Sequence, residues 1–135
     1  MIKTVSLQTA KLLKEEGFPQ ETALFYRVDE FGNVFERNAN EDPLKMQKVL
    51  GTNIYYAKPT TDELLEELPR EIRHKEAREI QPLRIYFGRK DLSVEYHLAF
   101  TLALHICQHK ELPEALAKMW LWLKKENLLK SPNAD

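Results

Sequence analysis

The chain has 135 residues, the size of a single domain that can bury a core of its own. Hydrophobic residues make up 43% and charged residues 30%, as in an ordinary globular protein, and a formal net charge of −1 excludes a global field that would attract nucleic acid or an anionic membrane. The single cysteine, Cys107, excludes an internal disulfide, and the N-terminal residues lack the long apolar core of a signal peptide or membrane anchor. We therefore expect a cytoplasmic protein without a membrane partner.

Apolar residues at helical spacing predict a first helix over residues 2–16, with Gly17 as its C-terminal stop. The residues on its apolar side are Ile2, Val5, Thr9, Leu12 and Leu13. Two runs rich in strand-forming residues, 23–28 and 34–37, flank a turn sequence and predict a hairpin. Residues 38–53 indicate a loop containing a short helical turn, and 54–57 an extended segment.

The second half of the chain begins with a capping box, in which Thr60 caps a short helix over residues 60–68. The charge-laced run 70–81 would form a surface helix if it is helical. A second hairpin is predicted over residues 83–97, and the apolar alternation then continues to Ile106. One strand of that length is unusual in a small domain, so a bend in the strand and a change to helix both stay open.

The longest strongly helical stretch comes last and predicts a helix over residues 112–127. Its apolar stripe centres on Leu116, Met119 and Leu123, which we expect to be buried against a sheet. The order of elements predicts a single α+β domain over residues 1–135, with residues 130–135 as a disordered tail. Its antiparallel sheet would consist of both hairpins, with the helices 2–16, 60–68 and 112–127 packed on one face.

The candidate metal ligands are His105, Cys107 and His109, because alternate residues share one face of a strand and the two histidines also share one face of a helix. No carboxylate stands at a recognised spacing to complete the set, so we predict no metal site and no cofactor. Cys107 with a neighbouring histidine as its base would give a small enzyme. A buried cysteine is the simpler interpretation, so we predict no catalytic residue and no enzyme.

Basic residues between positions 70 and 90 are the candidate contacts to nucleic acid, and two aromatic residues, Tyr86 and Phe87, are close to them in sequence. The candidates are Arg70, Arg73, Arg78, Arg89 and Lys90. Glutamates interrupt the same run, so a solvated, salt-bridged surface is the favoured interpretation.

Apolar residues outside the stripe of the last helix are candidates for an interface. Trp120 and Trp122 flank the stripe on opposite sides, Leu121 points among lysines, and the run 98–106 has no evident cover. A two-fold homodimer would bury them, whereas the first helix and the loop 38–53 would bury them in a monomer. Both alternatives stay open.

Three stretches together resemble small uncharacterised proteins from phages and other mobile elements of gut bacteria of the Bacteroides kind. They are YYAKPTTDELLEELPREI at 55–72, LRIYFG and LSVEYH within 83–97, and LPEALAKMWLWLKKENLL at 112–129. The resemblance covers the second half of the chain and implies no activity, cofactor or catalytic residue. With the residue patterns, it leads us to expect a non-catalytic binding or assembly module of a mobile element. A nucleic-acid accessory protein using residues 70–90 is the alternative, and a small enzyme or metal protein the third.

Overall fold

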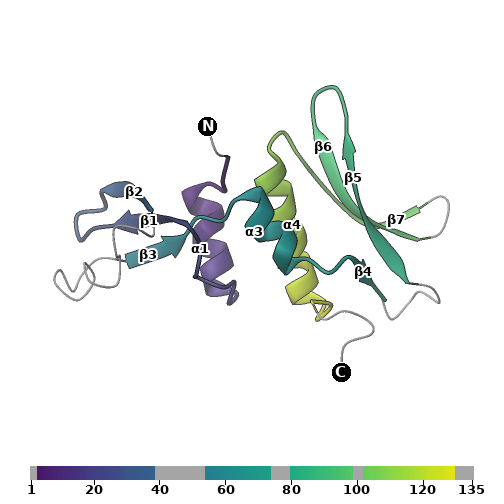
Figure 1. The fold of residues 1–135 in the computed structure, drawn as a ribbon, viewed down its shortest axis with the longest axis horizontal. Coiled ribbons are helices and arrows are strands. Elements are labelled where there is room, and N and C mark those ends of the chain that lie inside the picture. The colour runs from purple at the N-terminus through teal and green to yellow at the C-terminus, as the bar shows by residue number, and fades with distance from the viewer. Residues whose placement is uncertain (1–2, 39–53, 74–79, 99–101, 130–135) are drawn as a thin grey trace. The chain divides into compact units, whose positions relative to one another are not determined.

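The structure is a computed structural model that describes residues 3–38, 54–73, 80–98 and 102–129. Contacts divide the chain into two compact units, residues 1–60 and 61–135 (Figure 1). The described residues form three helices and two antiparallel sheets, so the predicted α+β class is confirmed. The expectation that residues 1–135 form one domain stays a prediction, and the predicted tail 130–135 lies outside the described residues.

The first helix, α1 (Leu7–Glu15), is shorter than expected at its N-terminus. The Ser6 hydroxyl caps it by accepting a hydrogen bond from the Thr9 N–H at 3.3 Å, whereas Thr4 forms an antiparallel bridge with Thr60. Gly17 ends the helix with φ at 89°, a left-handed conformation that glycine adopts without strain. Its N–H and that of Phe18 then satisfy two of the last helical carbonyls, as the predicted stop requires.

The sheet of the first unit has the strand order β2-β1-β3. Its strands are β1 (Leu24–Val28), β2 (Val34–Asn38) and β3 (Ile54–Ala57). The predicted hairpin is confirmed, since the Asp29 carboxylate accepts hydrogen bonds from the N–H groups of Phe31 and Asn33 and holds the turn between β1 and β2. The helix α1 packs against β3.

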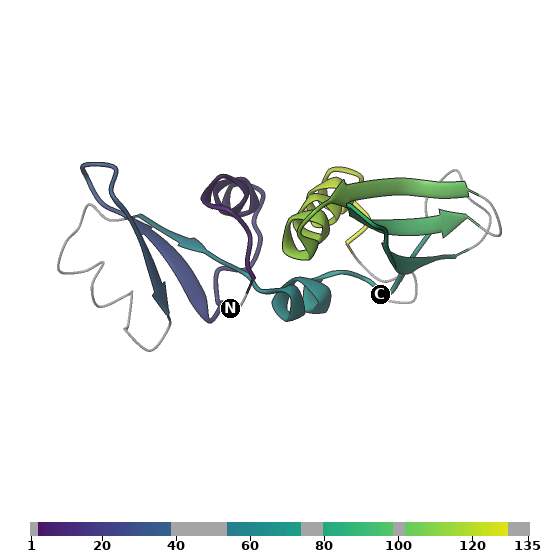
Figure 2. The ribbon, with the colours of Figure 1, turned by 90° about the horizontal axis from the view of Figure 1, so that it is seen from above.

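The second unit contains a four-stranded sheet in the order β4-β5-β6-β7 and two helices. Its elements are α3 (Thr61–Glu67), β4 (Glu71–Ile72), β5 (Gln81–Phe87), β6 (Leu92–Leu98), β7 (Leu102–His109) and α4 (Leu112–Lys125). The predicted second hairpin is confirmed as β5 and β6. Figure 2 shows α4 against one side of this sheet, where it packs on β6 and β7, and α3 packs on α4.

Two expectations about the sheets are wrong. The hairpins do not share one sheet, because β1 pairs with β2 and β3, whereas β5 pairs with β4 and β6. The three helices therefore do not cover one common face: α1 packs on the first sheet and α4 on the second. The run 70–81, for which a surface helix was only a conditional expectation, begins as a strand, because Glu71 and Ile72 pair with β5 and the Ile72 side chain is fully buried.

The apolar alternation from 92 to 106 belongs to two strands, since β6 ends at Leu98 and β7 pairs back along it from Leu102. A register shift between Tyr96 and His97 interrupts the ladder, as at a β-bulge. This arrangement brings both halves of the run under α4.

The core of the second unit lies beneath α4, where Leu116, Met119 and Leu123 are each 0% exposed, as the stripe predicts. The helix ends at a non-glycine residue, Asn127, with φ at 59°. The N–H groups of Asn127 and Leu128 donate to the last carbonyls of α4 in the same pattern that ends α1.

Among the described residues, no helix combines the length and apolar character needed to cross a bilayer.

Candidate functional site

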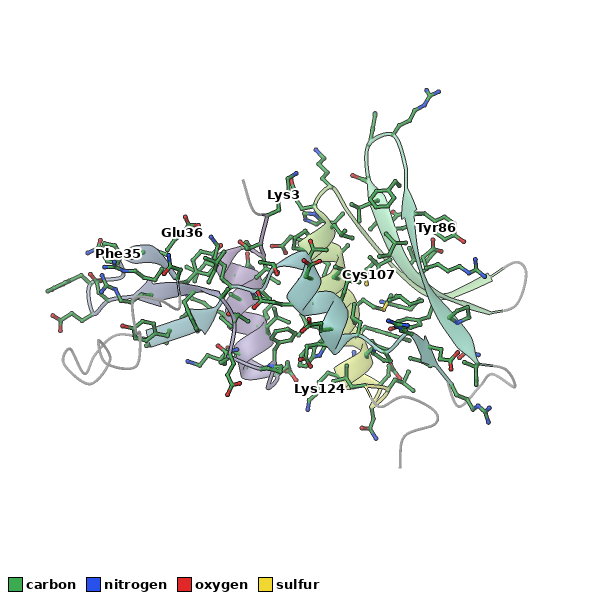
Figure 3. The ribbon with its side chains drawn as sticks, in the orientation of Figure 1. Lys3, Phe35, Glu36, Tyr86, Cys107 and Lys124 are labelled. Atoms are coloured by element: carbon green, nitrogen blue, oxygen red, sulfur yellow. The ribbon has the colours of Figure 1, made fainter. Side chains whose placement is uncertain are left out.

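The three candidate metal ligands do share one face of β7, and α4 covers that face. The His105 ring stacks on Trp122 of α4, with the ring centroids 4.3 Å apart and the planes inclined by 2°. Cys107 is buried, and Figure 3 shows it beside α4. His109 accepts a hydrogen bond at Nδ1 from the Glu111 N–H at 2.9 Å, at the entry to α4. Each side chain thus has a structural role between strand and helix.

This row does not have the chemistry of a nucleophile or of a metal centre. Burial raises the pKa of the Cys107 thiol to about 11, although the charge of Lys118 opposes the shift. The group is therefore a neutral thiol near pH 7, whereas a cysteine nucleophile reacts as the thiolate. Within the part of the chain that the structure describes, no three His, Cys, Asp or Glu side chains are grouped as ligands of one metal ion.

The His105–Trp122 stack predicts a loss of stability in mild acid. Burial lowers the pKa of His105 below its ordinary 6.5, although the charge of Glu126 opposes the shift. The unfolded chain therefore takes up this proton at a higher pH than the folded chain. The contribution of neutral His105 to the free energy of unfolding is therefore complete above the ordinary pKa of 6.5. It decreases as the pH falls below that value toward the lower pKa of the folded chain.

Urea unfolding at about pH 7.5 and about pH 5.5 measures this effect. His105→Phe keeps a flat ring against Trp122 without a titrating group, so this variant should lose less stability between the two pH values than the wild type. An NMR titration that places the pKa of His105 above 6.5 would contradict the prediction.

The candidate nucleic-acid contacts fall into two separate groups. Arg70 and Arg73 flank β4, which pairs with the start of β5, whereas Arg89 and Lys90 lie in the turn after the end of β5. All four are exposed, but Arg70 lies beside Leu83, and the rest of β5 separates it from the turn by about 15 Å. Arg78 lies outside the described residues. Arg84 is exposed on β5 between the two groups, but Glu95 of β6 lies directly opposite it, so an acidic residue interrupts the basic surface among the described residues.

The three candidate interface residues on α4 differ in exposure. Trp120 is only 3% exposed, whereas Leu121 and Trp122 are partly exposed and Trp122 carries the His105 stack. Trp120 is thus a core residue. Only Leu121 and part of Trp122 remain as surface.

A different feature, the outer edge of β7, was only partly indicated by the sequence. β7 is the last strand of its sheet, and among the described residues no strand pairs with its outer edge. Its eight residues include no charged side chain and no proline. On the sheet face opposite α4, Ile106 is 48% and Tyr86 45% exposed (Tyr86 is labelled in Figure 3). The alternation of 98–106 indicated an apolar run, but only the pairing with β6 shows that it is an open edge.

Between these two exposed side chains lies Glu95, which is directly opposite Ile106 on β7 and Arg84 on β5. It is 9% exposed and accepts a hydrogen bond from the Ser93 hydroxyl at 2.9 Å. The centre of this face is therefore a hydrogen-bonded carboxylate, and its exposed apolar side chains, Tyr86 and Ile106, lie on either side of it.

Comparisons with protein families, with curated proteins and with solved structures yield no match to this chain. The resemblance to mobile-element proteins consequently stays a prediction.

Proposed function

We propose that this protein is a non-catalytic assembly module that binds a second copy of itself through the outer edge of β7. The observation that carries the proposal is this open edge of eight uncharged residues. The backbone N–H and C=O groups on the outer side of an edge strand are a template for a further strand. The accessory role in a mobile element rests on the sequence resemblance alone.

A second copy fits this edge because antiparallel pairing of β7 with itself is compatible with two-fold symmetry. If the axis passes near Ile106, this exposed residue lies opposite its own counterpart and both lose apolar surface to water. No like charges oppose one another along the strand. The other described edge strands are shorter: β2 has five residues including Glu36 and Arg37, β3 four and β4 two.

The non-catalytic part of the proposal is supported by the state of Cys107, whose raised pKa keeps the thiol protonated. The histidines beside it are engaged in a ring stack and in a hydrogen bond at the start of α4. Nucleic-acid binding by the basic residues of 70–90 stays a prediction, because those that the structure describes do not share one surface.

Ile106→Lys should convert the dimer to a monomer, because two ammonium groups would meet at the symmetry axis. Light scattering at micromolar concentration should give about twice the 15.9 kDa chain mass for the wild type and the single chain mass for the variant. Val34→Lys is the matched control, since Val34 is 46% exposed on the edge strand β2 of the first unit. A wild-type mass of one chain that stays unchanged on tenfold concentration would end the proposal.

A further inference from the structure

The helix α4 runs back along the edge strand β7. At the entry to the helix, the Glu111 N–H donates to Nδ1 of His109 at 2.9 Å. Further along the helix, the Trp122 ring stacks on His105 with the ring centroids 4.3 Å apart. The helix rises about 16 Å between its two contact points, and β7 spans about 13 Å between the two histidines. These similar lengths mean that α4 follows the edge strand.

Three side chains of α4 lie on the flank of the helix that faces β7. Trp122 contacts His105 directly. Burial raises the pKa of Cys107, and the charge of Lys118 opposes this shift. Burial lowers the pKa of His105, and the charge of Glu126 opposes this shift. Both charges therefore lie near β7, and with Trp122, four residues from each, they form one row along α4, which we call the edge row.

The opposite flank of α4 is already covered. Trp120 lies about 200° around the helix from Trp122 and is only 3% exposed, and Ala117 beside it is fully buried. In the edge row, by contrast, Lys118 is exposed, and Trp122 and Glu126 are partly exposed. Since β7 is the outermost strand of its sheet, the edge row lies on the open side of α4.

Pairing of β7 with a second copy brings two α4 helices together. In a continuous antiparallel sheet both copies present the same face on the same side, so the two helices lie on one side of the sheet. Because α4 packs on β6 and β7, it lies about half a strand spacing inside the edge strand. The two helix axes are then about two strand spacings apart, or about 10 Å, the distance at which packed helices touch.

The edge row is complementary to a second copy of itself. The two-fold axis of the proposed dimer passes near Ile106, the neighbour of His105, so Trp122 lies close to this axis. The two helices run antiparallel, so Lys118 of one copy lies toward Glu126 of the other, and the reverse. The row thus has an apolar centre and opposite charges at its two ends.

We propose that the edge rows of two copies pack against each other over the paired β7 strands, with the Trp122 rings buried between two pairs of Lys118 and Glu126. This proposal rests on the β7 dimer proposed above and adds a second layer to its interface. The tryptophan rings supply apolar area on this face of the sheet, as Ile106 does on the other face. The charge pairs fix the antiparallel direction of the helices.

Charge reversal tests the pairing across the dimer. Lys118→Glu and Glu126→Lys should each raise the dissociation constant of the dimer about fivefold to tenfold, because each brings like charges together twice. The double variant should restore the wild-type dissociation constant. The two positions are about 12 Å apart along one helix, so this rescue can come only from the second copy. Lys124→Glu is the matched control, since Lys124 is exposed on α4 outside the edge row and its reversal should leave the dimer unchanged.

Acrylamide quenching of tryptophan fluorescence gives a second measurement. Trp120 is buried within the chain, so the fluorescence that acrylamide quenches comes mainly from Trp122. In the wild-type dimer, Trp122 should be less accessible to acrylamide than in the Ile106→Lys monomer.

The outcomes separate this proposal from the β7 dimer. If light scattering shows that the wild type is a monomer, both fail. If the wild type is a dimer, three results would overturn the helix contact and leave the β7 pairing intact. These are equal dissociation constants for Lys118→Glu and Lys124→Glu, a double variant that does not recover, or quenching of Trp122 that is the same in dimer and monomer.

Discussion

Leu116→Ala should lower the free energy of unfolding by about 2–5 kcal/mol. Leu116 is fully buried on α4, the helix that packs on β6, β7 and α3. Truncation removes apolar contacts and also leaves a cavity, because close-packed neighbours move only partly into the space. Met119 and Leu123 beside it are also fully buried, so few routes to relaxation remain.

Urea unfolding followed by tryptophan fluorescence measures this loss, since both tryptophans of the chain lie on α4. Leu121→Ala is the matched control on the same helix, because Leu121 is partly exposed and its truncation should cost less than about 1 kcal/mol. Equal losses for the two variants would show that the stripe of α4 does not form the core.

The helices were predictable because their signals are local. In α4 the stripe, the early proline and the late lysines lie within a few turns of each other, and the three expected core residues are buried. The stripe did not predict the burial of Trp120, which lies on its flank. Because α4 contacts α3 as well as the sheet, Trp120 is a core residue instead of an interface residue. At α1, the N-terminal apolar residues fitted a helix, but the bridge between Thr4 and Thr60 and the Ser6 cap delay its start.

The division into two sheets was not predictable from the same signals. Each hairpin is fixed by its own turn, but which strands join the two hairpins depends on contacts between residues far apart in the chain. The pair Glu71 and Ile72 illustrates this, because nothing within the charged run 70–81 marks Ile72 as a fully buried strand residue. Its burial depends on pairing with β5.

The same reason explains which candidate residues the sequence revealed. The spacing of His105, Cys107 and His109 correctly predicted that they share one strand face. It did not predict that a helix covers this face and contacts these side chains.

Tyr96→Phe should lower the free energy of unfolding by about 1–3 kcal/mol, although it removes a single oxygen. Tyr96 is fully buried in β6, and its hydroxyl donates to the Pro69 carbonyl oxygen at 2.6 Å, which connects the sheet to the segment that follows α3. Without the hydroxyl, this carbonyl loses its partner in a partly buried position. Burial raises the pKa of Tyr96, so the folded chain keeps the donor proton at a pH where the unfolded chain releases it. The contribution is therefore complete below pH 10.0, the ordinary pKa, and decreases as the pH rises above it. Urea unfolding of both proteins at neutral and alkaline pH measures it, and a difference that stays constant or grows above that pH would contradict the assignment.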